Sequence, residues 1–457
     1  MESRPKKMIR LKGTNNFDDR LSGMPDHLIV HILSFMPTLD AVKTMLLRRF
    51  GNLWTLVPAL WFDFDLYDRI CLPDDEEVTY YDVFTSFARF VRNVLLLHRS
   101  PTIDSFRLFI KPLEIRFEDR RIIHDIQMWL RFVTDRQVKD VDFCFDGFDK
   151  LALPHCIVTS QSLTRLTLFG CTLEHRPHVD FHMESLRELS LSDVKGSNEA
   201  FNQVISGCPN LREVKIDGAD ELSVLNITPP SVHKLCLNLQ NLDHSFTLSC
   251  PNVKILEVAV SSRHESFMVD AVAVSSLQLV NVADLPYVDF SPFETFLRQI
   301  RNVDVFTLSR DAFQKLCWGK VKINFPRNRW KRMVLRPCMY DKKCLQRTLE
   351  LLKSSVKLEE LIIYSEFARC IDEYESPQLS TTICEMPRLK KVTILRSGGF
   401  SKFHLQLVEL LLGNAVVLEK LVITPHQNPL TVVDEMHLIK QVSKFRRASA
   451  NASVIFA

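Results

Sequence analysis

The sequence has little glycine and none of the short motifs that mark common enzyme classes. Only 12 of its 457 residues are glycine. They form no Gly-rich phosphate loop and no GxSxG nucleophile elbow, and the zinc-protease motif HExxH is also missing. These absences argue against the enzyme classes that depend on such motifs. We therefore expect a protein that is not an enzyme and has no catalytic residue.

The sequence also lacks paired cysteines. Its 12 cysteines include no CxxC pair, so a structural zinc site is not indicated. The one group of metal-type side chains has irregular spacing in a proline-containing loop, and it comprises Cys171, His175, His178 and His182. We expect reduced thiols that are mostly buried as small apolar residues, and neither a metal nor any other cofactor.

No excess of charge and no long apolar run is present. The 58 basic residues nearly balance the 55 acidic ones, for a formal net charge of +3. This balance argues against bulk affinity for nucleic acid or for a membrane surface. No run reaches the 18 or so apolar residues of a membrane span, and residues 1–12 contain no apolar core of a secretory signal. We expect a protein of the cytoplasm, the nucleus or both.

What the chain does have is a short helical stretch at residues 19–58, ahead of a longer body with a different pattern. Pro25 suits the first turn of a helix, and Pro37 should end that helix. Apolar residues recur between them at helical spacing, over much of the helix circumference. Asp40 is the expected N-cap of a second helix, and a third apolar patch surrounds Trp54. So short a segment buries only part of its apolar surface, so the rest should pack on the body or on a partner.

This stretch resembles the F-box of plant F-box/leucine-rich-repeat proteins. The resemblance rests on the runs HILSFMPTLDAVKT and NLWTLVP. It implies docking on the S-phase kinase-associated adaptor of cullin–RING ubiquitin ligases. The residues that it places on the adaptor-binding surface are Pro25, Leu28, Ile32, Leu33, Pro37, Leu53 and Trp54. One departure from the family pattern is the segment Leu47–Gly51, which is one residue short and carries Phe50 in place of tryptophan.

The body repeats a six-residue pattern, apolar-x-x-apolar-x-apolar, whose copies begin 21 to 35 residues apart. Each copy predicts a short strand with alternate side chains facing the core, and the spacing is typical of leucine-rich repeats. Helical stretches at 200–206, 346–353 and 405–412 precede several strands. The copies begin at Ile103, Val138, Leu163, Leu186, Leu211, Val232, Val253, Val274, Val303, Trp330, Leu358, Leu389 and Leu418.

These patterns predict an α/β fold in which a small helical F-box precedes a leucine-rich-repeat horseshoe solenoid with parallel strands on its concave face. The runs MPRLKKVTI, LVELLLGNAVVLEKLVI and KFRRASANASVIF resemble the FBD-type region that follows such repeats. We expect the F-box at 19–66 and a linker with a helical N-terminal cap at 67–98. The repeats should then occupy 99–360, and FBD-like last repeats with a C-terminal cap should occupy 361–457.

The strand positions that alternate with the core residues should line the concave face and bind a protein substrate. Both charge signs occur there, and a few residues dominate most protein interfaces. The candidate substrate-binding residues are Arg165, Glu188, Glu213, Lys215, Arg332, Arg336, Glu360, Tyr364, Lys391 and Lys420.

The resemblance implies a non-catalytic substrate receptor of an SCF-type ubiquitin ligase, with an unidentified protein substrate. One alternative is a binding scaffold uncoupled from the ligase by the altered head. Another is a small-molecule receptor, with aromatics such as Phe306, Trp330 and Tyr364 lining a pocket. A phosphate or inositol-polyphosphate site at the basic residues around Trp330 is also conceivable, although a solvated loop is the favoured interpretation there.

Overall fold

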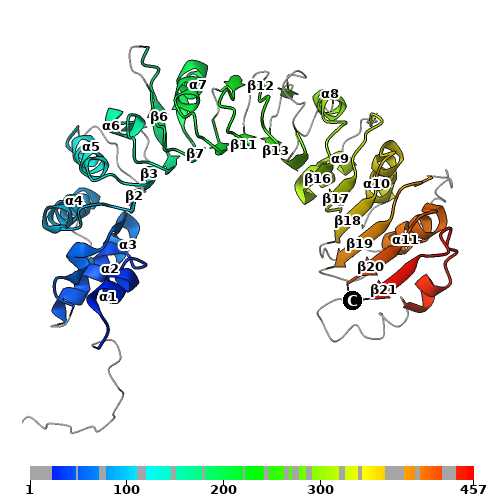
Figure 1. Cartoon of the computed structure of the whole chain (residues 1–457), viewed down its shortest axis with the longest axis horizontal. Helices are drawn as coiled ribbons and strands as arrows, with labels where there is room; N and C mark the ends of the chain where they lie inside the picture. The colour runs from blue at the N-terminus through cyan, green and yellow to red at the C-terminus, as the bar shows by residue number, and fades with distance from the viewer. Residues whose placement is uncertain are drawn as a thin grey trace, which may run out of the picture.

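The chain forms an arc of strands and helices (Figure 1). The structure, a computed structural model, describes residues 23–47, 50–71, 79–110, 120–145, 151–177, 181–219, 222–240, 246–261, 267–269, 277–284, 291–318, 325–337, 342–365, 385–396, 402–424 and 439–456. Several segments that the sequence analysis used, including Arg48, Arg49, His178 and Val274, lie outside these ranges.

One parallel sheet runs through the whole arc. In the described part of the chain it contains 15 strands in sequence order. They are β1 (Ala59–Asp63), β2 (Ser105–Ile110), β3 (Asp140–Phe145), β5 (Arg165–Phe169), β7 (Glu188–Ser192), β9 (Glu213–Asp217), β11 (Lys234–Gln240), β13 (Ile255–Ser261), β15 (Leu279–Asp284), β16 (Val305–Leu308), β17 (Arg332–Leu335), β18 (Glu360–Ser365), β19 (Lys391–Arg396), β20 (Lys420–Ile423) and β21 (Ser453–Phe456). This confirms the predicted mixed α/β repeat fold.

Helices cover the outer side of the arc, and the large sheet faces inward (Figure 1). The predicted helical stretches at 200–206, 346–353 and 405–412 are confirmed within α7, α10 and α11. The outer helices are α4 (Tyr80–Leu97), α5 (Arg120–Asp135), α6 (His155–Val158), α7 (Asn198–Ser206), α8 (Ser291–Gln299), α9 (Arg310–Trp318), α10 (Lys342–Ser354) and α11 (Lys402–Asn414). Two three-stranded sheets join them, β4 (Leu151–Ala152) with β6 (Cys171–Leu173) and β8 (Lys195–Gly196), and β10 (Val224–Asn226) with β12 (Phe246–Ser249) and β14 (Phe267–Val269).

The core is a stack of the inward-facing strand residues. In β5, Leu166 and Leu168 are buried while Arg165, Thr167 and Phe169 are not. Each repeat alone has too little apolar surface to fold, so stacking builds one continuous core. The same alternation recurs along the sheet, which leaves a second row of side chains on the concave face.

One predicted strand register was wrong. The expected pattern began at Val274 and placed Leu279 in the core. Instead, Val280 and Val282 are buried and pair with Leu256 and Val258 of the preceding strand. The local sequence fits the apolar pattern in two frames three residues apart, and the pairing with neighbouring strands selects the later one.

The head contains α1 (Asp26–Leu33), α2 (Thr38–Lys43), the short 3-10 turns η1 (Thr44–Leu46) and η2 (Leu53–Leu56), and α3 (Phe64–Cys71). The predicted N-cap at Asp40 was wrong, because α2 begins at Thr38 directly after Pro37. Asp40 lies instead in the first turn, where its charge suits the helix dipole. Strand β1 lies within the range predicted for the F-box, and it precedes α4, so the sheet begins inside that range.

Candidate functional site

The head presents an exposed apolar surface. Leu28 and Ile32 lie one turn apart on α1 and are 40% and 41% exposed. Pro25, just ahead of α1, is exposed as well, and Phe35 after it is 72% exposed. Further exposed apolar residues follow at Met45, Leu46, Leu47 and Leu56, which the sequence analysis did not single out. Such a cluster on a small domain is typical of a protein-binding surface.

Other predicted adaptor-binding residues lie inside the head. Leu33 and Trp54 are only 4% and 6% exposed and belong to the hydrophobic core. Pro37 and Leu53 are half-buried. The helical spacing placed both Leu28 and Leu33 on apolar stripes, but it could not show which stripe packs on η2.

The head is fixed to the sheet by hydrogen bonds. The Trp61 N–H of β1 donates to Thr38 Oγ1 at 2.8 Å, and the Arg99 N–H donates to the Thr55 carbonyl at 2.7 Å. His98, which is buried, donates from Nε2 to the Val57 carbonyl at 2.9 Å. Its Nδ1 accepts from Arg136 at 3.0 Å, so the ring is a neutral tautomer. The head therefore has a defined orientation on the first repeats.

An aromatic cluster continues this junction behind the first strand. Phe62 and Phe64 belong to β1 and the start of α3, and their rings pack against Phe90 and Phe87 of α4. Phe87 also packs edge-on against Trp129 of α5. Closely packed aromatic rings leave little room for one element to slide past another. The ring contacts therefore link the head, through α4, to α5 of the body.

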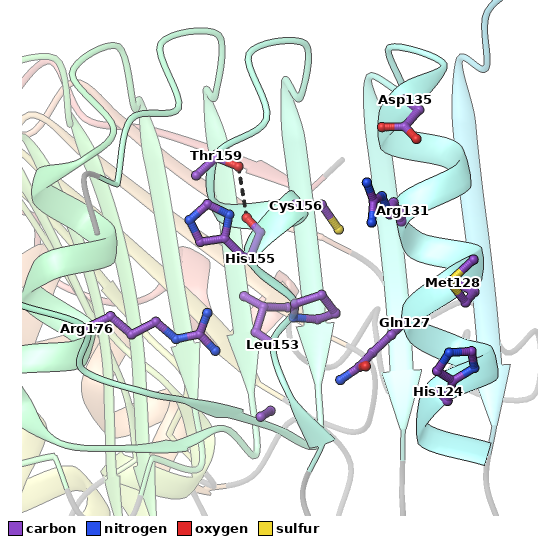
Figure 2. Close-up of a pocket in the computed structure, with 12 residues that line it drawn as sticks. His124, Gln127, Met128, Arg131, Asp135, Leu153, His155, Cys156, Thr159 and Arg176 are labelled. Atoms are coloured by element: carbon purple, nitrogen blue, oxygen red, sulfur yellow. Dashed lines mark hydrogen bonds between the residues drawn. The ribbon is translucent and has the colours of Figure 1, made fainter. Parts of the chain in front are cut away.

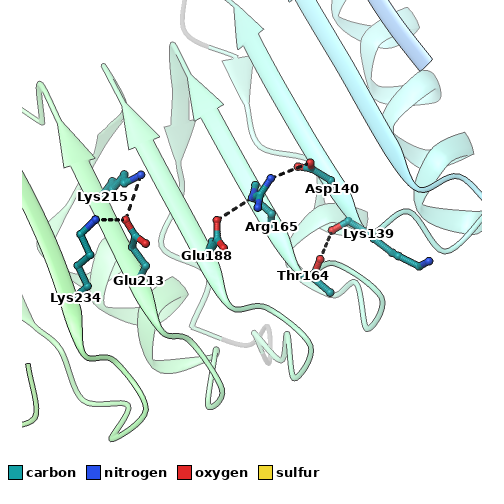
Figure 3. A network of polar contacts seen from close by, with 8 residues as sticks. All are labelled: Lys139, Asp140, Thr164, Arg165, Glu188, Glu213, Lys215 and Lys234. Carbon is teal, nitrogen blue, oxygen red and sulfur yellow. Dashed lines mark hydrogen bonds and ion pairs between the residues drawn. The ribbon is translucent and has the colours of Figure 1, made fainter. Parts of the chain in front are cut away.

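The predicted substrate-binding residues all lie on the exposed face of the large sheet or directly after its strands. Toward the N-terminal half they form an ion-pair ladder (Figure 3). Arg165 donates to Glu188 at 2.8 Å and lies 3.4 Å from Asp140. Glu213 accepts from Lys215 at 3.2 Å and from Lys234 at 3.0 Å. Exposed ion pairs contribute little stability, so this ladder mainly sets side-chain positions.

The charges of this ladder support one another. The hydrogen bond with Glu188 and the nearby Asp140 raise the pKa of Arg165. Burial opposes ionisation of Glu213, but the hydrogen bonds from Lys234 and Lys215 outweigh it and lower its pKa. The same contact with Glu213 raises the pKa of Lys234. Burial raises the pKa of Asp140, and the nearby Arg165 opposes this rise. The three acids and three bases of the ladder are paired, so their charges largely cancel.

The C-terminal half of the concave face carries a second ladder with a surplus of cations. Glu360 accepts from Arg332 at 3.2 Å and from Lys391 at 2.8 Å. The Arg336 guanidinium lies 4.8 Å from the centre of the Tyr364 ring. Lys420 extends the same row on β20. Apolar residues also lie on this face, among them Leu279, Val305 and Val334, which are not among the predicted substrate-binding residues.

Two aromatics proposed as pocket-lining residues belong to the core instead. Trp330 is fully buried and stacks on Phe306, with ring centres 4.0 Å apart. Its indole N–H donates to the Ile300 carbonyl at 3.1 Å. The prediction of a small-molecule pocket lined by these two rings was wrong, because both rings are fully buried against each other and the indole N–H already has a partner. Around Trp330, Lys331 pairs with Asp304 and Arg332 with Glu360, so these two basic residues are already neutralised.

A cavity of about 640 Å³ lies on the outer side, between α5 and the segment that contains α6 (Figure 2). Its walls carry Arg131, Asp135 and Arg176 together with Met128 and Leu153. Arg176 is paired with a neighbouring glutamate, Glu174, at 2.8 Å. Because the acids offset the arginines, this cavity has no surplus of charge that would select a class of ligand.

Within the described ranges there is no cluster of three metal-type side chains. Cys171 is fully buried, and His182 pairs with Glu184 at 2.8 Å. Burial raises the pKa values of Cys208 and Cys250 to about 12, so these two thiols are packing groups, as expected for most cysteines of this sequence. Every helix that the structure describes is too short or too polar to span a bilayer.

Comparison with known proteins matches residues 126–310 to the family model described as FBD-associated F-box protein At5g56370, LRR repeats. The Arabidopsis thaliana F-box/FBD/LRR-repeat protein At5g56420 is 32% identical over 255 residues, which is 53% of this chain and 56% of that protein. The F-box/LRR-repeat protein At3g03360 and the FBD-associated F-box protein At4g10400, from the same plant, are 25% and 26% identical over 76% of this chain. These matches cover 70% and 78% of the two relatives.

These matches agree with the geometry, since the matched residues run from within α5 to the start of α9 and contain eight of the stacked strands, β3 to β16 of the large sheet. The first relative is matched over little more than half of its length. The chain is therefore similar to Arabidopsis F-box/FBD/LRR-repeat proteins, and its residues 126–310 match the leucine-rich-repeat region of an FBD-associated F-box protein.

Proposed function

We propose that this chain is the non-catalytic substrate-recognition subunit of an SCF-type cullin–RING ubiquitin ligase. The head binds the S-phase kinase-associated adaptor, and the concave face binds a protein substrate in the cytoplasm or the nucleus. The observation that carries the proposal is an exposed apolar surface on a head that is hydrogen-bonded to a repeat-built sheet. The names of the relatives, all F-box proteins, point the same way.

The head surface has the composition of a binding interface. Leu28, Ile32 and Phe35 are exposed, although moving their side chains out of water would lower the free energy. Burying an exposed leucine or isoleucine fully gains roughly 1.5–3 kcal/mol. A partner with a matching apolar groove would bury them, with the flanking polar residues forming a rim.

The contribution of this chain to ubiquitin transfer would be positioning. A substrate on the concave face lies at a fixed distance from the head, because the junction through His98, Thr38 and the aromatic cluster leaves little freedom. Holding two reactants together in a suitable orientation raises the rate without any catalytic side chain.

Co-purification with the adaptor tests the proposal. The wild-type chain should elute with the adaptor, and the variant Leu28→Arg with Ile32→Arg should not, because two charges would be buried unpaired in the interface. Both positions are exposed, so this variant should keep the wild-type circular dichroism and melting temperature. A folded wild-type head that recovers no adaptor would favour the alternative of a scaffold uncoupled from the ligase.

A matched pair of leucines separates docking from folding. Leu28→Ala removes the same atoms as Leu33→Ala, but Leu33 is buried. Leu33→Ala should lower the free energy of unfolding of the head by about 2–5 kcal/mol. Leu28→Ala should leave stability within about 0.5 kcal/mol of wild type and weaken the adaptor complex. Equal loss of binding in both, in proportion to stability, would contradict a docking role for Leu28.

A further inference from the structure

The concave face differs in character between its two halves. Neighbouring strands align one side chain per strand into rows across the sheet. One row reads Asp142, Thr167, Ser190 and Lys215 in the N-terminal half, and it is polar throughout. The row is still polar at Asn281 and Thr307 on β15 and β16. On β17 to β20 it reads Val334, Ile362, Thr393 and Val422, so three of its last four residues are apolar.

The adjacent row is apolar on earlier strands. It passes from Lys234 on β11 to Ile255, Leu279 and Val305 on the next three strands, and then to Arg332. The last four of these residues are less than fully buried, so their side chains meet the concave surface. We call the residues Leu279, Val305, Val334, Val422, Arg332, Arg336, Lys391 and Lys420 the C-terminal concave surface.

The charges of this surface do not cancel. Among the residues that the structure describes on β17 to β20 and directly after β17, four cations face the concave side, and Glu360 is the one carboxylate among them. Arg336 contacts the Tyr364 ring, and neither it nor Lys420 has a carboxylate partner in the described part. The residues just before these strands form the rim of the sheet. There Lys331 pairs with Asp304 and Lys390 pairs with Glu359, so the rim lysines add no net positive charge. Glu419 adds one negative charge next to Lys420 in the sequence.

We infer that the C-terminal concave surface binds a protein segment in which apolar side chains alternate with carboxylates. This inference rests on the proposed function and names the chemistry of its substrate. Apolar side chains of the segment pack on Leu279, Val305 and Val334. Its carboxylates pair with Arg336, Lys391 and Lys420, which supply the charge complementarity. The N-terminal ladder, by contrast, is already neutralised by its own residues.

The dimensions fit a short extended segment. The surface spans the six adjacent strands β15 to β20, and neighbouring strands lie about 4.8 Å apart. The resulting span of about 24 Å accommodates roughly seven residues of extended chain. A few central residues then dominate the affinity, as at most interfaces.

Fluorescence anisotropy with the full-length chain and three synthetic peptides tests this inference. The peptides share alternating leucines and differ at the other positions, which are glutamate, glutamine or lysine. The glutamate peptide should bind at least about tenfold more tightly than the lysine peptide, and higher salt should reduce the difference. If wild type binds none of the peptides, or all three equally, the inference is overturned.

Charge reversal supplies the second arm. Arg336→Glu with Lys420→Glu should weaken binding of the glutamate peptide about tenfold and strengthen binding of the lysine peptide. Lys139→Glu makes the same type of change in the N-terminal half, at an exposed lysine that pairs with Asp104 just before β3, and should alter binding less than about twofold. Unchanged peptide preference in the double variant would contradict the assigned surface.

Adaptor co-purification separates this inference from the proposed function. Arg336 and Lys420 lie far along the chain from the head, so the double variant should still recover the adaptor. If the adaptor is recovered but the peptide preference is absent, only the inference about the surface fails. If the preference holds and wild type recovers no adaptor, the ligase role fails and the binding surface remains.

Discussion

At the scale of single residues, burial separates side chains that the sequence alone treats alike. Ile29 and Leu33 of α1 are in the core, whereas Leu28 and Ile32 are exposed. All four fit a helical apolar pattern, and only the packing of η2 against α1 decides between them. His98 is a comparable case, because its sequence position gave no sign that it is buried between the head and the first repeats.

The titration of His98 should couple the head–body junction to pH. Burial of the ring lowers its pKa, the nearby Arg136 lowers it further, and the hydrogen bond with Val57 opposes them only in part. An unfolded histidine has a pKa of about 6.5. Protonation therefore favours the unfolded state, and the stabilisation from neutral His98 is complete above about pH 6.5 and is lost as the pH falls below it.

Melting temperatures of wild type and His98→Gln at pH 7.5 and 5.5 measure this effect. Glutamine can donate to the Val57 carbonyl and accept from Arg136, but it does not titrate in this range. The wild-type melting temperature should fall more than that of the variant on acidification. Parallel falls in the two proteins would show that His98 carries no such linkage.

At the scale of elements, the sequence predicted most strands and left their pairing open. Twelve of the thirteen strand patterns have the predicted residues in the core, because a leucine-rich strand alternates clearly. The pattern at Val274 failed because two frames fit equally well. In the large sheet, strands β1 and β21 were missed. They lie before the first and after the last copy of the repeated pattern, so the repeat spacing did not indicate them.

The candidate site was predictable in part for the same reason. Alternation places Arg165, Glu213 and Glu360 on the concave face, and the structure agrees. Their ion-pair partners depend on which residues align across strands, and repeats of 21 to 35 residues do not reveal that register. The apolar character of the C-terminal half appears only when these rows are assembled.

The capping box of α4 should stabilise the first turn of the longest described helix. Thr79 Oγ1 accepts from the Asp82 N–H at 3.3 Å, and the Thr79 N–H donates to the Asp82 carboxylate at 3.3 Å. Thr79 is exposed, so Thr79→Ala removes the cap without opening a cavity. We expect a loss of about 1 kcal/mol, measured as faster hydrogen exchange in the first turn of α4.

Thr79→Ser is the control for this prediction. Serine keeps the hydroxyl group, so protection of the first turn should stay close to that of wild type. Equal exchange rates in wild type, Thr79→Ser and Thr79→Ala would mean that packing of Phe84 and Phe87 alone holds this end of the helix.

At the scale of the whole molecule, the two terminal strands of the large sheet differ in how their outer edges are covered. The first strand, β1, is covered by the head, through the hydrogen bond from Trp61 to Thr38. The last strand, β21, has a neighbour on one side only in the described sheet. A bare strand edge invites pairing with another chain, so solenoids depend on their terminal repeats for solubility.

We predict that the segment 439–456 acts as a cap on the last repeat. Val442 is buried, the Ala448 N–H donates to the Leu412 carbonyl at 2.8 Å, and Ser449 Oγ donates to the Leu418 carbonyl at 2.7 Å. Strand β21 then pairs with β20 from Ser453 to Phe456. These contacts satisfy backbone groups of the last repeat and cover its core.

Removing this cap should cause association without unfolding the head. A chain ending at residue 438 would bare the edge of β20 and the core around Leu421, and light scattering should then show concentration-dependent oligomers. Val454→Lys should act in the same direction, because Val454 aligns with the buried Leu421. Ser453→Lys changes the adjacent, exposed position and should associate no more than wild type. If the truncated chain associates no more than wild type and still recovers the adaptor, the last strand does not protect the sheet.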